Sequence, residues 1–265
     1  MTDRYAVIGH PVSHSKSPWI HASFARATGQ SLEYGAIEAP REGFREAVDA
    51  FRAAGGKGLN VTLPFKEQAF AYCTRTSERA RSAAAVNTID FREGAYGDNT
   101  DGIGLVRDLA GNLGLRLAGV RVLLMGAGGA AQGVAGALLE SGIATLVIAN
   151  RTVERAQALA QRFPPASACG YDALGGERFE LAINATSAGL AGQALALPDG
   201  VFRPGMLAYD MTYGRETPFL AAARAAGARA SDGAGMLLEQ AAESFFLWRG
   251  VRPPTEGLLA ALRRA

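Results

Sequence analysis

The sequence predicts an α/β protein, and three observations lead to that prediction. Short apolar runs alternate with amphipathic segments along the chain, which is typical of repeated β-α units and mostly parallel sheets. A glycine-rich turn at residue 126 stands between a strand-like run and a helix-like segment. The length of 265 residues allows two modest domains or one large one.

The first part of the chain is expected to alternate strands and helices. Ser17 is a suitable N-cap and Pro18 a suitable first helical residue, so a helix is predicted there. Gly55 and Gly56 are expected to end another helix. The predicted strands lie at residues 5–9, 32–37 and 58–62, with a hairpin of 85–91 and 95–97; the predicted helices lie at 17–28, 43–54 and 64–72.

In the second part of the chain, the predicted β-α units are more tightly spaced. A helix is expected to begin near Asn99 and Thr100 and to lead into it. No strand is predicted after the last two helices, so we expect them to pack back on the N-terminal part. The predicted strands lie at residues 120–125, 145–149, 181–185, 206–211 and 228–231. One predicted helix runs from the glycine-rich turn to Ser141, and the others lie at 153–162, 235–248 and 255–264.

The composition excludes several classes of protein. The formal net charge of +2 and the lack of a basic stripe argue against nucleic-acid binding, and residues 75–81 are interpreted as a solvated helix face or end. No run is long and apolar enough to span a membrane, and no signal-peptide pattern precedes the first strand. The three histidines and two cysteines lack the spacing of a metal site, so no metal is expected. Two distant cysteines favour free thiols in a reducing, cytoplasmic compartment.

The glycine-rich turn predicts a dinucleotide site. It fits the G-x-G-x-x-G/A pattern, in which the first glycine makes the tight turn and the second lets the backbone approach a pyrophosphate. The small third residue lets helix and strand pack closely, and the helix N-terminus offers free N–H groups to phosphates. The turn comprises Gly126, Ala127, Gly128, Gly129, Ala130 and Ala131.

The end of the next strand favours NADP over NAD. NAD sites usually place a carboxylate there for the ribose 2′-hydroxyl, but this chain has Asn150, Arg151 and Thr152, with Arg155 one helical turn further. A guanidinium fork suits a 2′-phosphate. The alternative is that both arginines are surface charges at a helix start, where the helix dipole opposes cations by about 0.3–1 kcal/mol each.

A second group of polar residues lies in the first half, at predicted strand ends. Ligands of open α/β sheets bind at the carboxyl ends of the strands, and short hydroxyl and amide side chains there suit a small polyol. The segments concerned are residues 14–18, 60–66, 85–88 and 97–102.

With these motifs and their order, the sequence resembles the shikimate dehydrogenase family over essentially its whole length. Further matching stretches are residues 184–187, 210–213 with 217–218, and 232–240. The resemblance implies an N-terminal α/β substrate domain (residues 1–101, with the helices of 235–265 packing on it), an NADP-binding Rossmann domain (102–234), and a central cleft. It also implies reversible reduction of 3-dehydroshikimate to shikimate in aromatic amino acid and chorismate biosynthesis, by a monomer or homodimer.

The resemblance also assigns site residues. Lys66 and Asp101 would be the catalytic pair, with the Lys66 ammonium stabilising and protonating the alkoxide that hydride transfer produces. Glu78 could lie near the cofactor. The substrate would contact Ser15, Ser17, Thr62, Asn87, Asp101, Tyr213 and Gln240. NADP would contact residues 126–131, Asn150, Arg151, Thr152, Arg155, Met211 and Gly233.

Each assignment has a plainer alternative. Lys66 could be an exposed lysine, and a carboxylate such as Asp101 is favoured in a first helical turn anyway. Asn87 could satisfy a backbone group, Gln240 could face solvent, and Tyr213 could bond locally. The sequence departs from the family at His10, Ala84 and Gly214, where Asn, Gly and Pro are common. Rival functions are a quinate/shikimate dehydrogenase using NAD and a non-catalytic ligand sensor of the same fold.

Overall fold

A computed structural model describes residues 2–189 and 192–264. The chain divides into two compact units: Met1–Gly104 with Leu238–Ala265, and Leu105–Leu237. The expected domain limits, after residues 101 and 234, stay a prediction. No helix in the described part of the chain is long and apolar enough to cross a membrane.

The first unit is built on a mixed six-stranded sheet, in the order β2-β1-β3-β5-β6-β4. β1 runs parallel to both β2 and β3, β5 is antiparallel to β3 and β6, and β4 runs parallel to β6 at the other edge of the sheet. The strands are β1 (Asp3–Gly9), β2 (Leu32–Glu38), β3 (Gly56–Val61), β4 (Arg75–Thr76), β5 (Thr88–Asp90) and β6 (Tyr96–Asp98).

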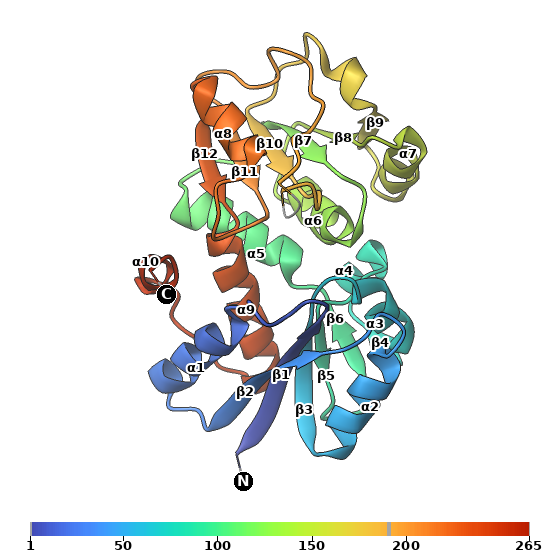
Figure 1. Cartoon of the computed structure of the whole chain (residues 1–265), viewed down its shortest axis with the longest axis vertical. Helices are drawn as coiled ribbons and strands as arrows, with labels where there is room; N and C mark the ends of the chain where they lie inside the picture. Colours follow the sequence, from blue (N-terminus) through green and yellow to red (C-terminus); the bar gives the residue numbers. More distant parts are fainter. Residues whose placement is uncertain (1, 190–191, 265) are drawn as a thin grey trace. The chain divides into compact units, whose positions relative to one another are not determined.

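Helices cover both faces of this sheet (Figure 1). On one side, Phe44 of α2 and Phe65 pack with the apolar residues of β1 and β3. On the other side, Phe24 of α1 meets Phe245 of α9 with ring centroids 5.7 Å apart. α9 therefore packs against α1 on this side of the sheet. The helices are α1 (Ser17–Thr28), α2 (Phe44–Ala53), α3 (Lys66–Tyr72), α4 (Glu78–Ala83), α9 (Ala234–Arg249) and α10 (Leu258–Leu262).

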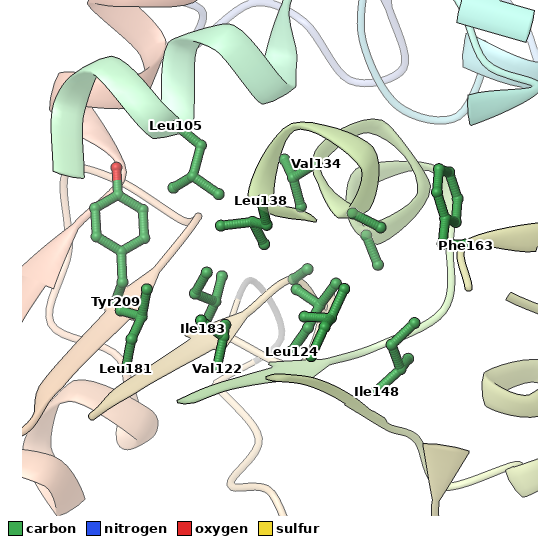
Figure 2. Close-up of a cluster of buried hydrophobic side chains, with 14 of the residues drawn as sticks. Leu105, Val122, Leu124, Val134, Leu138, Ile148, Phe163, Leu181, Ile183 and Tyr209 are labelled. Carbon is green, nitrogen blue, oxygen red and sulfur yellow. The ribbon is translucent and has the colours of Figure 1, made fainter. Parts of the chain in front are cut away.

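The second unit contains a fully parallel six-stranded sheet, in the order β12-β11-β10-β7-β8-β9. Figure 2 shows Val134 and Leu138 of α6 packed over Val122 and Ile183 of the sheet. The strands are β7 (Arg121–Met125), β8 (Thr145–Ala149), β9 (Ser167–Cys169), β10 (Leu181–Asn184), β11 (Leu207–Asp210) and β12 (Arg229–Asp232); the helical segments are α5 (Asp101–Arg107), η1 (Asp108–Asn112), α6 (Gly129–Glu140), α7 (Val153–Arg162), η2 (Tyr171–Leu174) and α8 (Pro218–Ala225). The α/β class predicted from the sequence is confirmed.

Three local predictions were wrong. Ser17 is not the N-cap of α1, because Lys16 already has helical angles and occupies that position, while the Ser17 N–H donates to Ser15 Oγ at 3.3 Å. The helix expected to begin at Pro64 begins at Lys66, after a cis Leu63-Pro64 bond. Of the strand predicted at residues 85–91, only Thr88–Asp90 is a strand.

The segment at residues 75–81 fits the prediction of a solvated helix face or end at Arg75 and Arg81, which are exposed, but not at Arg79. It contains β4 and the first half of α4, whose N-cap is Ser77, with Ser77 Oγ accepting from Ala80 N at 3.1 Å. Arg79 is half-buried there in an ion pair with Asp98. The sequence around Arg79 could not indicate this ion pair, because Arg79 lies in α4 and its partner Asp98 lies in β6.

A neutral histidine lies in the aromatic layer between α1 and the sheet. His21 is fully buried, and its ring stacks on Tyr34 at 4.1 Å with an interplanar angle of 3°. Among the described residues, neither ring nitrogen has a partner in normal hydrogen-bond geometry. Burial lowers the pKa of His21 to about 3, and the nearby Asn60 amide opposes that shift only partly.

This buried histidine predicts a dependence of stability on pH. The unfolded chain binds a proton at His21 below about pH 6.5, whereas the folded chain resists it, so folding should lose about 1.4 kcal/mol per pH unit from pH 6.5 down towards 3. Thermal unfolding should show a flatter Tm profile over this range for His21→Phe than for the wild type. The exposed-site control His14→Ala should keep the wild-type slope, and equal slopes for wild type and His21→Phe would contradict the assignment.

Candidate active site

Lys66 and Asp101 form a partly enclosed ion pair in the first unit. Lys66 is the first residue of α3 and Asp101 the first of α5, so the starts of two helices meet here. The Lys66 ammonium donates to Asp101 Oδ2, and the two side chains are 15% and 6% exposed. Such burial favours the pair over an exposed surface lysine, and it leaves a small part of the Lys66 side chain accessible.

Asn87 holds the other oxygen of Asp101. Its Nδ2 donates to Asp101 Oδ1 at 2.8 Å, and the backbone N–H of Thr100 donates to Asn87 Oδ1 at 2.8 Å. Gln240 of α9 completes the group, because its Oε1 lies 3.3 Å from Asn87 Nδ2. The structure therefore brings four predicted site residues together, and Gln240 is nine-tenths buried rather than solvent-facing.

Behind these residues lies a layer of buried polar groups that sequence reasoning did not single out. Asn60 Nδ2 donates to Ser244 Oγ at 2.9 Å and to Thr88 Oγ1 at 3.1 Å, while Tyr34 Oη donates to Asn60 Oδ1 at 2.7 Å. Tyr34 also bonds to the Ser17 side chain. The antiparallel register that places Asn60 opposite Thr88 creates this layer, and no local sequence signal gives that register.

Ser15, Ser17 and Thr62 lie at the carboxyl ends of β1 and β3. Ser15 and Thr62 are half-buried and Ser17 is buried at the start of α1. Thr62 N donates to Ile8 O at 2.9 Å, which joins the two strand ends. These three hydroxyls therefore lie at the edge of the sheet where α/β proteins bind ligands.

The turn that carries Asp101 is fixed by a second ion cluster. Asp98 Oδ1 accepts from Asn99 N at 2.8 Å, from Ser77 Oγ at 2.6 Å and from Arg79 Nε at 2.7 Å. Arg79 also pairs with Glu243 of α9 at 3.5 Å. Burial raises the pKa of Asp98, but the Arg79 guanidinium together with the hydrogen bonds from Ser77 and Asn99 lowers it by more, so that pKa lies below its ordinary value.

Glu78 lies one residue before Arg79, at the start of α4, and is exposed. Its contact with a cofactor stays a prediction.

In the second unit, the glycine-rich turn has the geometry that a pyrophosphate site requires. Gly126 has φ +107°, and a Cβ there would lie 3.1 Å from Ala185 O, so only glycine is unstrained. Gly128 is the N-cap of α6, and no side chain in the described residues caps that helix. A Cβ on Gly128 would meet nothing within 4 Å, and Ala131 is fully buried against the sheet. Ala127, Gly129 and Ala130 complete the turn. The N–H groups at the start of the helix can donate hydrogen bonds to phosphate oxygens.

Beside this turn, Asn150 and Thr152 lead from β8 into α7. Asn150 Nδ2 donates to Thr152 O at 2.8 Å, and Thr152 is the helix N-cap. Arg151 and Arg155 are exposed, and within residues 2–189 and 192–264 neither forms an ion pair with a carboxylate. Two cations without a counter-charge at a helix N-terminus fit an anionic ligand group.

The remaining predicted residues follow β11 and β12. Met211 and Tyr213 are half-buried after β11, and a Cβ on Gly233 would lie 2.4 Å from Met211 O, so the two segments touch through glycine. Asp210 anchors these loops: its Oδ2 accepts from Asn184 Nδ2 at 3.0 Å and from Thr217 Oγ1 at 2.7 Å.

Among residues 2–189 and 192–264, no group of three or more His, Cys, Asp or Glu side chains could hold a metal ion.

Comparisons with known proteins agree across the chain. Three family models match: the shikimate dehydrogenase substrate binding domain at residues 7–89, shikimate / quinate 5-dehydrogenase at 108–190, and the shikimate 5'-dehydrogenase C-terminal domain at 233–263. A curated relative from Methylobacillus flagellatus, named shikimate dehydrogenase (NADP(+)), is 57% identical over 269 residues, which cover 99% of this chain and 100% of the relative.

Solved structures give the same result. A shikimate 5-dehydrogenase from Thermus thermophilus, crystallised with NADP(H) and shikimate, is 37% identical with a TM-score of 0.90, and the match covers 99% of each chain. An Ael1 enzyme from Pseudomonas putida is 49% identical with a TM-score of 0.93, and the match covers 98% of each chain.

The two unpaired arginines predict how the chain discriminates between dinucleotides. Replacing both (Arg151→Ser with Arg155→Ser) should weaken NADP binding by about 1.5–3 kcal/mol, because charge-assisted bonds to the 2′-phosphate are lost. NAD binding should change little. Titration calorimetry of both dinucleotides measures this, with Arg224→Ser, an exposed arginine of the same unit paired with Glu216, as the control. An unchanged NADP-to-NAD affinity ratio would contradict the assignment.

Proposed function

The chain belongs to the shikimate dehydrogenase family, and from that premise we propose that it is an NADP-dependent shikimate dehydrogenase. It would reduce the ring ketone of 3-dehydroshikimate to the hydroxyl of shikimate, and would catalyse the reverse reaction as well. The observation that carries the proposal is the Lys66–Asp101 pair, because a mostly buried ammonium held in place by a carboxylate is the group such a reaction needs.

The second unit fits NADP on its own geometry. The glycine-rich turn leaves the first N–H groups of α6 free for the pyrophosphate, and Arg151 and Arg155 would hold the 2′-phosphate. Asn150, Thr152, Met211 and Gly233 would line the rest of the site. When bound, the reduced cofactor supplies the hydride.

The substrate would be held by the short polar side chains of the first unit. Ser15 and Ser17 would bind the carboxylate, close to the start of α1. Thr62, Asn87 and Gln240 would bind ring hydroxyls. The family resemblance adds Tyr213 as a further contact.

Lys66 and Asp101 would perform the proton chemistry. As the carbonyl carbon gains the hydride, the oxygen becomes an alkoxide, and the Lys66 ammonium stabilises that charge and transfers its proton to the oxygen. Asp101 keeps the ammonium in place and is itself kept in place by Asn87. In the oxidation direction, neutral Lys66 accepts the hydroxyl proton as the hydride leaves.

The setting of the reaction follows from the same premise. Both cysteines, Cys73 and Cys169, are free thiols, which suits a reducing compartment. We therefore infer a cytoplasmic enzyme of aromatic amino acid and chorismate biosynthesis, acting as a monomer or a homodimer.

A crossed steady-state assay tests the proposed function. Nicotinamide absorbance is followed with shikimate and with quinate, each combined with NADP and with NAD. We expect turnover mainly with shikimate and NADP. Strong quinate or NAD turnover would instead place the chain with the broader quinate/shikimate dehydrogenases, and a folded protein that binds NADP without any turnover would favour a ligand sensor.

Removing the ammonium tests the role of Lys66. Lys66→Ala should lower kcat by about 10²–10⁴-fold, the usual contribution of a general acid–base group, while KM for shikimate changes only a few-fold. Lys57→Ala, which removes an exposed lysine of β3, is the matched control. A kcat close to that of the wild type in Lys66→Ala would remove Lys66 from this role.

A further inference from the structure

The orientation of the Asn87 amide is imposed by its neighbours. A backbone N–H can only donate, so the Thr100 N–H, 2.8 Å away, must face the amide oxygen. An ionised carboxylate can only accept, so Asp101 Oδ1, also at 2.8 Å, must face the amide nitrogen. Asn87 is 2% exposed, which leaves its amide little access to water. A flipped amide would oppose like groups on both sides and would release Asp101.

The Thr88 hydroxyl reinforces this orientation. Thr88 is fully buried and donates its proton to Asn87 Oδ1 at 2.9 Å. Asn60 Nδ2, at 3.1 Å, can only donate and therefore points at the oxygen of Thr88. Ser244 Oγ lies 2.7 Å from the same oxygen, accepts from Asn60 and has the Gln240 carbonyl oxygen as an acceptor at 3.0 Å. Asn87 Oδ1 can only accept, so its 2.9 Å contact is a hydrogen bond that the Thr88 hydroxyl donates, and Ser244 Oγ is the other acceptor within reach of the same proton.

Resting on the proposed function, we infer that Thr88 is a positioning residue for the reaction. Through Asn87, its hydroxyl keeps an N–H aimed at Asp101, and Asp101 in turn holds the Lys66 ammonium where the proton is transferred. Ser244, on α9, supports Thr88 from behind. A C-terminal helix is thereby connected to the reacting group through three successive side chains, Thr88, Asn87 and Asp101.

The test separates the effect of the side-chain volume at residue 88 from the effect of its hydroxyl group. Thr88→Val keeps the volume and removes the proton donor, and we expect kcat to fall about tenfold, the equivalent of one net hydrogen bond, with KM for NADP unchanged. Thr88→Ser restores the hydroxyl and should return kcat to within about twofold of the wild type. Thr145→Val is the matched control, because the Thr145 hydroxyl, in β8, has no hydrogen-bond partner in the described residues.

A double-mutant cycle separates positioning from general damage to the fold. In an Asn87→Ala background, Thr88→Val should change kcat by less than about twofold, because the side chain through which Thr88 acts is gone. An equal loss in both backgrounds would overturn the inference. Should Thr88→Val not fold, Ser244→Ala replaces it in the same cycle. We then expect a smaller loss of kcat than for Thr88→Val, and we expect it only when Asn87 is present.

The outcome also distinguishes this inference from the function on which it rests. Turnover of shikimate by the wild type together with an unchanged kcat in Thr88→Val would overturn only the role of Thr88. Absence of turnover by the wild-type protein would overturn the proposed function and, with it, the positioning role.

Discussion

The hydrogen bond from the Asn87 amide to Asp101 is the interaction on which the arrangement of the site depends. Asp101 is 4% exposed, and a buried carboxylate is costly unless each of its oxygens has a donor. Lys66 supplies one donor and Asn87 the other. Asn87 immediately precedes β5, its backbone oxygen accepts from Val61 N of β3 at 2.8 Å, and its amide bonds to Thr100 and Asp101 at the start of α5, so three elements meet at this residue. The Lys66 ammonium is therefore held in place by buried side chains of the first unit, and it does not move as an exposed surface lysine would.

The return of the C-terminal helix to the N-terminal sheet follows from the same need to satisfy buried polar groups. α9 brings Gln240, Glu243 and Ser244 against the turn that carries Asp101, where they face Asn87, Arg79 and Thr88. Aromatic packing of Phe245 and Trp248 against α1 and β1 supplies the apolar part of this contact. A helix that is distant in sequence thus completes the group around Lys66 and Asp101, whose other members lie within the first 101 residues.

Regular and local features were predictable from the sequence, and features that depend on long-range partners were not. β8 and α7 follow their predicted ranges because their periodicity is strong and a fixed turn separates them. The glycine-rich turn was predictable because each glycine has a local steric reason. The role of Arg79 and the buried position of Gln240 were not, since each depends on a residue of another strand or helix. The prediction of Ser17 as an N-cap was wrong because nothing in the sequence indicates that Lys16 already has helical backbone angles. Substrate contacts came from family resemblance alone and stay predictions.

The most direct test of this account is a crystal structure of the protein with shikimate and NADP bound. The account predicts that Lys66 Nζ lies within about 2.6–3.2 Å of the substrate oxygen whose carbon exchanges the hydride, with Asn87 Nδ2 still on Asp101. It would be contradicted by that oxygen lying against another proton donor, with Lys66 directed away from it.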